Sequence, residues 1–152
     1  MDNLSIEVGN GVHLRAASSY IRLQVFVLER SLALSDEFDQ KDQSDTIYSV
    51  LFEEALPVVT ARFLQEDERV ARIGRVATLK DYRGKQLGSR VVNSLEALAK
   101  EKQIERLLIH AELTAAGFYE GLGYCSAGKP YDEDGVCLLY TSPSPRDSTS
   151  SR

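Results

Sequence analysis

The sequence predicts an α/β fold in which a mixed, mostly antiparallel sheet packs against helices. Residues 46–52 and 57–63 are strand-like apolar runs joined by a short link, which is typical of an antiparallel hairpin. Farther along the chain, a strand-like run at 70–79, a helical pattern at 87–103 and an apolar run at 106–111 follow one another. This order predicts a right-handed β–α–β unit with two parallel strands.

Length and composition limit the classes of protein to consider. The 152 residues are enough for one domain with its own core. The net charge of −5 argues against a nucleic-acid partner, and no apolar run approaches the roughly 20 residues that span a bilayer. The N-terminus lacks the features of a signal peptide. Cys125 and Cys137 lack metal-ligand spacing, so we expect a cytoplasmic protein with no metal site.

The N-terminal third predicts a strand and then a helix. Residues 4–8 alternate between apolar and polar side chains, as a half-buried strand does. Residues 14–34 contain neither Gly nor Pro, and Ile21, Val25 and Leu28 lie on one helical stripe. We therefore expect one helix over residues 14–34.

The segment Ser35–Asp45 is strongly acidic. It carries five acidic residues against the single Lys41. A run of charge is usually a solvated loop. The alternative is an acidic rim that attracts a cationic amine. The sequence leaves both interpretations open.

The second half of the chain predicts two further helices. The clearest covers residues 87–103, where one apolar face is formed by Leu87, Val91, Leu95 and Leu98. A shorter helix is predicted over 114–122, with Thr114 as a possible N-cap and Gly123 as its end. Tyr124 then begins another extended segment.

The stretch Ile73–Gly88 has the features of a phosphate-binding loop. A strand ends there, and a basic, glycine-bearing loop leads into the predicted helix. Unpaired N–H groups and the helix dipole attract an anion to a helix N-terminus. Cations alone would oppose that dipole, so the basic residues favour a bound anion. The residues expected to hold a pyrophosphate are Arg83, Gly84, Lys85, Gln86, Leu87, Gly88 and Ser89.

The order of these motifs resembles that of the GCN5-related N-acetyltransferases, the GNAT family. The sequence YRGKQLG at Tyr82–Gly88 stands between a strand and a long helix, and FYEGLGY at Phe118–Tyr124 follows the second parallel strand. The resemblance covers roughly residues 4–136. The VFVLE sequence within Arg22–Glu29 and the DEDG sequence at Asp132–Gly135 further resemble a small bacterial subgroup, most of whose members lack assigned substrates.

One position departs from the family's loop pattern, Arg/Gln-x-x-Gly-x-Gly/Ala. Arg83 and Gly88 match it, but Gln86 stands where the first glycine is usual. That glycine lets the backbone approach a pyrophosphate closely. Gln86 can still work there if its backbone stays helical and its side chain points outward. Because glutamine replaces the glycine, we expect weaker cofactor affinity rather than none.

The resemblance implies a three-layer α+β fold, with helices on both faces of the sheet and a central parallel strand pair that splays apart. Acetyl-CoA is then the acetyl donor, and its pantetheine arm pairs with the backbone of Val76, Ala77 and Thr78. A backbone N–H there can polarise the thioester carbonyl. Tyr119 matches the family tyrosine that protonates the departing thiolate, and its phenol is protonated at neutral pH.

The resemblance leaves the general base and the acceptor open. Glu112, Glu29 and His110 are candidates for the base, and the amine can also lose its proton to bulk water. Neither cysteine has the sequence context of a nucleophile, so we expect direct attack by a primary amine of a small molecule or a peptide N-terminus. The alternative is an acyl-CoA-binding module with little or no turnover. Assembly as a homodimer is left open.

The composition changes at Cys137. The last 16 residues, CLLYTSPSPRDSTSSR, are rich in Ser, Thr and Pro and offer nothing to bury beyond Tyr140. They also resemble translated sequencing-adapter read-through. We therefore expect an acetyltransferase domain at residues 1–136 and a non-native tail at 137–152, disordered beyond 140. A native flexible tail is the alternative.

Overall fold

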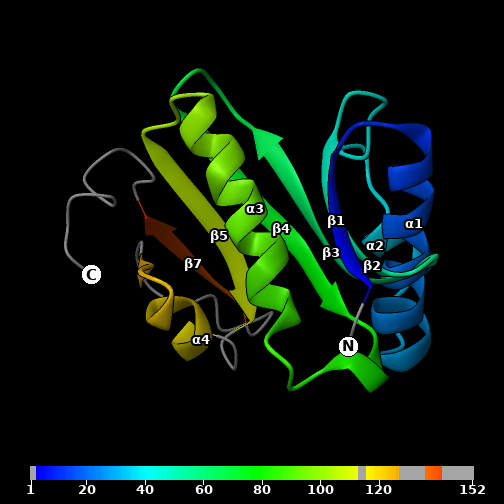
Figure 1. The fold of residues 1–152 in the computed structure, drawn as a ribbon. Helices are drawn as coiled ribbons and strands as arrows, with labels where there is room; N and C mark the ends of the chain where they lie inside the picture. The colour runs from blue at the N-terminus through cyan, green and yellow to red at the C-terminus, as the bar shows by residue number, and fades with distance from the viewer. Residues whose placement is uncertain (1–2, 113–115, 127–135, 142–152) are drawn as a thin grey trace. The chain divides into compact units, whose positions relative to one another are not determined.

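The computed structural model describes residues 3–112, 116–126 and 136–141, and these residues form two compact units (Figure 1). The first unit holds the chain up to Leu64 together with Arg75–Leu95. The second holds Gln65–Gly74 and the described residues from Glu96 onward. Strand β4 (Val70–Thr78) and helix α3 (Leu87–Glu101) each contribute residues to both units.

The first unit contains an antiparallel sheet. Strand β1 (Leu4–Gly9) pairs with β2 (Ile47–Glu53), and β2 pairs with β3 (Leu56–Gln65). The second half of β4 follows β3 in the strand order, and just beyond it the Leu79 N–H donates to the Val58 carbonyl at 2.9 Å. The hairpin predicted from the two apolar runs is therefore confirmed.

Helices cover both faces of this sheet. Tyr48 and Val50 of β2 are buried in a core cluster with Ile21 of α1 (Val12–Arg22), which lies beside β1 and β2 in Figure 1. Ser49, between them, points to the other face, where its hydroxyl lies 2.6 Å from that of Ser94 in α3. Side chains alternate along a strand, so α1 and the first half of α3 pack on opposite faces.

The single helix predicted over residues 14–34 is wrong. Helix α1 ends at Arg22, a π-helix continues over Leu23–Glu29, and a separate turn, α2, covers Leu34–Glu37. A π-helix has more residues per turn than an α-helix, so the apolar stripe rotates away from the core. Leu28, placed on the buried stripe by the 3.6-residue pattern, is 62% exposed.

The acidic segment is largely exposed, as a solvated loop is, but it is not a free acidic rim. Three of its five carboxylates pair with arginines from α1, β3 and β4. Arg22 is fully buried, and it donates from Nε to Glu37 Oε2 and from Nη1 to Asp42 Oδ1, each at 2.8 Å. The other ion pairs join Arg62 to Asp39 and Asp42, at 3.2 and 3.1 Å, and Arg75 to Glu37 and Asp39, at 3.3 and 3.2 Å. We call these six residues the arginine–carboxylate network.

Asp42 lies at the centre of the network. It accepts a 2.7 Å hydrogen bond from the Tyr48 hydroxyl in addition to its contacts with Arg22 and Arg62. Burial alone would raise the pKa of Asp42, but these hydrogen bonds and charges reverse the effect and hold it well below its usual range. Burial and the neighbouring carboxylate raise the pKa of Tyr48 to about 12.

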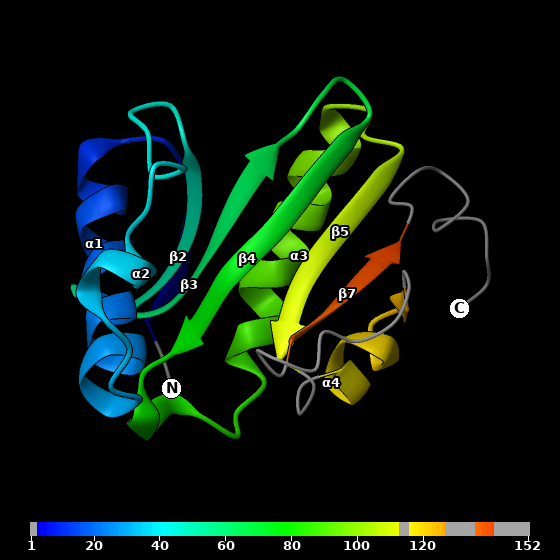
Figure 2. The same ribbon diagram turned by 180° about the vertical axis from the view of Figure 1, so that it is seen from behind.

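The second unit contains the parallel strand pair. Residues 70–73 of β4 pair with residues 106–109 of β5 (Arg106–Glu112), which confirms the predicted parallel pairing. The pairing ends at Ile73 and Ile109, although both strands continue. Figure 2 shows β5 between β4 and β7 (Val136–Thr141), to which β5 is antiparallel.

The remaining elements of the second unit are short. Helix α4 covers Ala116–Gly121, and β6 (Cys125–Ser126) pairs with β7. Strand β7 begins at the predicted domain boundary, residue 136, and includes the first residues of the predicted tail. Residues 142–152, the predicted N-cap at Thr114 and the DEDG sequence lie outside the described residues.

We predict that Asp42→Asn will destabilise the fold by about 3 kcal/mol at pH 7, because it removes one partner of a buried guanidinium. The lowered pKa of Asp42 contributes stability that is present above the ordinary value of 3.8 and lost as the pH falls below it. The variant should therefore lose less stability than the wild type between about pH 4 and pH 2. Urea denaturation at several pH values measures both effects.

Asp45→Asn is the matched control, since Asp45 belongs to the same segment and is exposed. It should change the free energy of unfolding by less than about 0.5 kcal/mol. If the two variants were equally stable, the arginine–carboxylate network would not have the structural role assigned to it.

Candidate functional site

The predicted cofactor-binding stretch lies in the first unit. Val76, Ala77 and Thr78 are the last residues of β4. The Ala77 side chain is buried in the core against α1. Thr78 lies beside the start of α3, since a Cβ added to Gly88 would lie 3.7 Å from Thr78 Oγ1. The Ala77 side chain is used in packing, so at this residue the strand end can offer a ligand only its backbone.

The regular backbone of β4 is interrupted at Arg75. Its φ of 52° lies in the left-handed region, which is uncommon for a residue other than glycine. Its side chain is anchored, with Nε donating to the Glu37 carbonyl at 3.2 Å and Nη2 to Asp39 Oδ2 at 3.2 Å. The arginine–carboxylate network thus holds β4 directly before the predicted pantetheine-binding residues.

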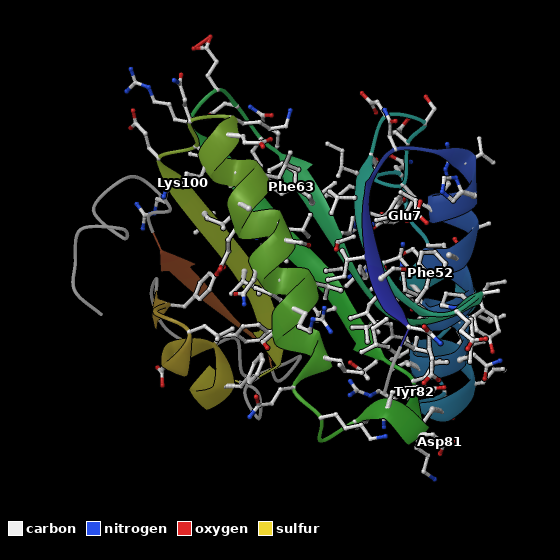
Figure 3. All side chains as sticks on the ribbon, viewed as in Figure 1. Glu7, Phe52, Phe63, Asp81, Tyr82 and Lys100 are labelled. Carbon is white, nitrogen blue, oxygen red and sulfur yellow. The ribbon has the colours of Figure 1, made fainter. Side chains whose placement is uncertain are left out.

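A turn and an exposed basic loop follow β4. The Tyr82 hydroxyl donates to Glu53 at 2.5 Å and fixes the turn at residues 80–82, where Figure 3 shows Asp81 and Tyr82 together. Residues 83–86 are exposed, and Gly84 has a φ of 79°. The first N–H groups of α3 have no partner within the helix, so the loop lies at the positive end of a helix dipole. This arrangement suits an anion.

Gln86 does not have the helical backbone that the sequence analysis named as the condition for its place in the loop. Its φ is 62°, in the left-handed region where a Cβ is disfavoured and glycine is not. Its side chain is exposed, and its carbonyl accepts a 2.8 Å hydrogen bond from the Ser89 hydroxyl. The loop therefore adopts a backbone that suits the glycine of the family pattern, although the chain has glutamine there.

Arg83 is paired with Glu29, at the end of the π-helix. Its Nη1 and Nη2 atoms each donate to a carboxylate oxygen of Glu29 at 2.7 Å, and its Nε donates to the Thr78 carbonyl at 3.0 Å. The hydrogen bonds from Arg83 lower the pKa of Glu29, and this weakens the case for Glu29 as a general base. Both residues were named from the sequence, but nothing in the sequence indicated that they form an ion pair, because 54 positions separate them.

A cavity of about 540 Å³ adjoins this loop. Its walls come from the end of α1 with the π-helix that continues it, from the first residue of β3 and from the turn after β4. The lining residues are Tyr20, Gln24, Val25, Leu28, Glu29, Leu56, Leu79, Lys80, Asp81 and Tyr82. The sequence named several of these residues but could not show that they meet, because they come from three separate segments.

The candidate catalytic residues belong to the second unit. Tyr119 of α4 is 5% exposed and packs edge-on against Phe118 and Tyr124, with ring centroids 4.9 and 6.1 Å away. Glu112 and His110 lie in β5, where their backbones pair with β7. The predicted cofactor-binding residues lie in the first unit, and the roles of Tyr119 and Glu112 in catalysis stay predictions.

Two wider features concern the described residues as a whole. None of the helices at 3–112 and 116–126 is both long and apolar enough to cross a bilayer. Across the same part of the chain and β7, no group of three or more His, Cys, Asp or Glu residues is placed to hold a metal ion.

Comparison with known proteins identifies the family. The family model described as acetyltransferase (GNAT) domain matches residues 15–140. An uncharacterized acetyltransferase of Streptococcus pyogenes is 42% identical over 102 residues, which cover 67% of this chain and 70% of that protein. A crystal structure from Lactobacillus plantarum, described as that of an N-acetyltransferase, is 38% identical with a TM-score of 0.86, over 93% of this chain and 99% of that chain.

A more distant structure shares the fold. The crystal structure of an acyl-CoA N-acyltransferase from Pseudomonas aeruginosa has a TM-score of 0.80 at 20% identity, over 91% of this chain and 99% of that chain. The predicted GNAT fold, with its mixed sheet and parallel strand pair, is therefore confirmed. On the family model and the relatives together, this chain belongs to the GNAT acetyltransferase family.

Proposed function

We propose that this protein is an N-acetyltransferase that moves an acetyl group from acetyl-CoA to a primary amine by direct attack. The observation that carries the proposal is the stretch Arg75–Ser89. A strand ends there, and an exposed basic loop follows at the start of α3. In a member of the GNAT family, this combination suits a pantetheine arm followed by a pyrophosphate.

The first unit supplies the binding groups of this proposal. The backbone of Val76, Ala77 and Thr78 pairs with the pantetheine arm, and one of its N–H groups donates to the thioester carbonyl oxygen as negative charge develops there. The N–H groups of residues 84–89 bind the pyrophosphate, and Arg83 and Lys85 neutralise its charge. Acetyl-CoA supplies the activated acetyl group.

Tyr119 is proposed as the acid that protonates the departing thiolate. A tyrosine phenol is protonated at neutral pH, so Tyr119 can supply the proton. In the overall transfer the amine nitrogen forms a bond to the acetyl carbon, and the carbon–sulfur bond breaks. The amine proton leaves to Glu112 or to water, and the phenol proton goes to the thiolate.

We predict that Tyr119→Phe will lower kcat by roughly 10²-fold or more and leave the Kd for CoA within about twofold, because only the proton donor is lost. Thiol release from acetyl-CoA over a panel of primary amines measures kcat, and calorimetry measures the Kd. Tyr124→Phe is the control, since that hydroxyl donates to Glu96 at 2.9 Å and has no proposed part in the chemistry.

The outcomes of this experiment separate the possible functions. Tight CoA binding without turnover on any amine would favour an acyl-CoA-binding module. Absence of CoA binding would overturn the proposed function altogether. A Tyr119→Phe variant as active as the Tyr124→Phe control would remove Tyr119 from the mechanism but leave the acetyltransferase.

We predict that Gln86→Gly will stabilise the fold by up to about 1 kcal/mol, because it removes a Cβ from a left-handed backbone. It should also strengthen CoA binding, since the backbone can then approach the pyrophosphate more closely. Urea denaturation and calorimetry measure the two effects. Gln86→Ala removes the same polar side chain but keeps the Cβ, so an equal gain from both variants would contradict the explanation.

A further inference from the structure

Glu29 lies between two features of the first unit. Both of its carboxylate oxygens accept hydrogen bonds from Arg83, in the basic loop. The same residue lines the cavity of about 540 Å³. One carboxylate therefore borders both the proposed pyrophosphate site and an open cavity next to it.

The cavity is suited to a ligand with an apolar body. Val25 and Leu79 contribute apolar surface from the edge of the core. Three large apolar side chains are exposed around it: Tyr20, Leu28 and Leu56, at 39, 62 and 40%. Exposed apolar side chains gathered at a cavity are typical of a binding site. The cavity also adjoins the proposed catalytic backbone, since Leu79 directly follows Thr78.

The charged residues of the cavity favour a cation. Glu29 and Asp81 stand on its wall with the single cation Lys80. While Glu29 is bound to Arg83, its charge is neutralised. If Arg83 were bound to another anion, the Glu29 carboxylate would be free to attract a positive group inside the cavity.

Glu29 and a pyrophosphate would compete for the same donors. The Nη1 and Nη2 atoms of Arg83 bind Glu29, and Nε binds a backbone carbonyl. Phosphate oxygens prefer this same two-pronged geometry, and two adjacent anions repel each other. The side chains of Arg83 and Glu29 are 38% and 35% exposed, so opening their ion pair costs little.

We propose that acetyl-CoA binding releases Glu29 from Arg83, and that the freed carboxylate binds the ammonium group of the acceptor in this cavity before the nitrogen loses one proton to water and attacks the thioester. The acceptor class is a primary amine that carries an apolar body. This inference rests on the proposed function and assigns to Glu29 the coupling between its two ligands. By linkage, each ligand strengthens the binding of the other.

The first test measures CoA binding by calorimetry. Glu29→Gln removes the competing carboxylate, so CoA should bind about two- to fivefold more tightly than to the wild type. Glu7→Gln is the matched control. It makes the same change of charge, and its carboxylate on β1 is paired with His13, which has no part in the proposed site. It should leave the Kd within about twofold.

The second test measures the binding of n-hexylamine with and without saturating CoA. In the wild type, CoA should strengthen hexylamine binding at least about fivefold, and in Glu29→Gln the difference should vanish. Leu28→Ser removes an exposed apolar side chain of the cavity. It should weaken hexylamine binding and leave CoA binding unchanged.

The results separate this inference from the proposed function. If the wild type does not bind CoA, the proposed function fails. If it binds CoA but Glu29→Gln binds CoA no more tightly, Glu29 only positions Arg83 and the inference is overturned. Hexylamine binding that is independent of CoA in the wild type also overturns the inference, whereas the acetyltransferase proposal stands.

Discussion

The buried guanidinium of Arg22 imposes the constraint on which the first unit depends. A cation that is fully buried must be paired and hydrogen-bonded, or it would cost several kcal/mol. Glu37 and Asp42 provide the partners, and the segment at residues 35–45 must therefore fold back towards the sheet. Arg62 and Arg75 complete the charge balance from β3 and β4. One electrostatic requirement thus joins α1, the acidic segment and two strands.

The same network explains an unusual backbone at the proposed site. Arg75 and Gln86 are both left-handed. Arg75 directly precedes the residues proposed to bind acetyl-CoA, and Gln86 is one of them. Such a conformation costs about 1–2 kcal/mol for a residue with a Cβ. Ion pairs to Glu37 and Asp39 offset this cost at Arg75. Strained backbone at two positions of one stretch is consistent with a backbone shaped for a ligand.

How much of this structure can be predicted depends on whether a sequence pattern is local or joins residues that are far apart in the chain. The hairpin and the β–α–β unit follow from local patterns of apolar residues, and both are present. The end of α1 at Arg22 was not predictable, because the π-helix that follows contains neither Gly nor Pro. The partners of the acidic segment come from other elements, as with Arg22 and Asp42, which are 20 positions apart. Charged residues on a strand form no periodic pattern that would indicate their partners. Glutamine as a residue type also gives no indication of a left-handed backbone, so the conformation of Gln86 was not predictable.

The pairing of Arg83 with Glu29 changes the meaning of the basic loop. Cations at a helix N-terminus oppose the dipole, so the sequence predicted an anion there. The free protein already supplies one, since the Glu29 carboxylate lies 2.7 Å from Arg83. A pyrophosphate that binds there, as proposed, would replace an internal anion, and part of its binding energy would be used to release Glu29. If that carboxylate then holds the acceptor, the energy is recovered when the second substrate binds. The release of Glu29 and the selection of an amine would then have one physical origin.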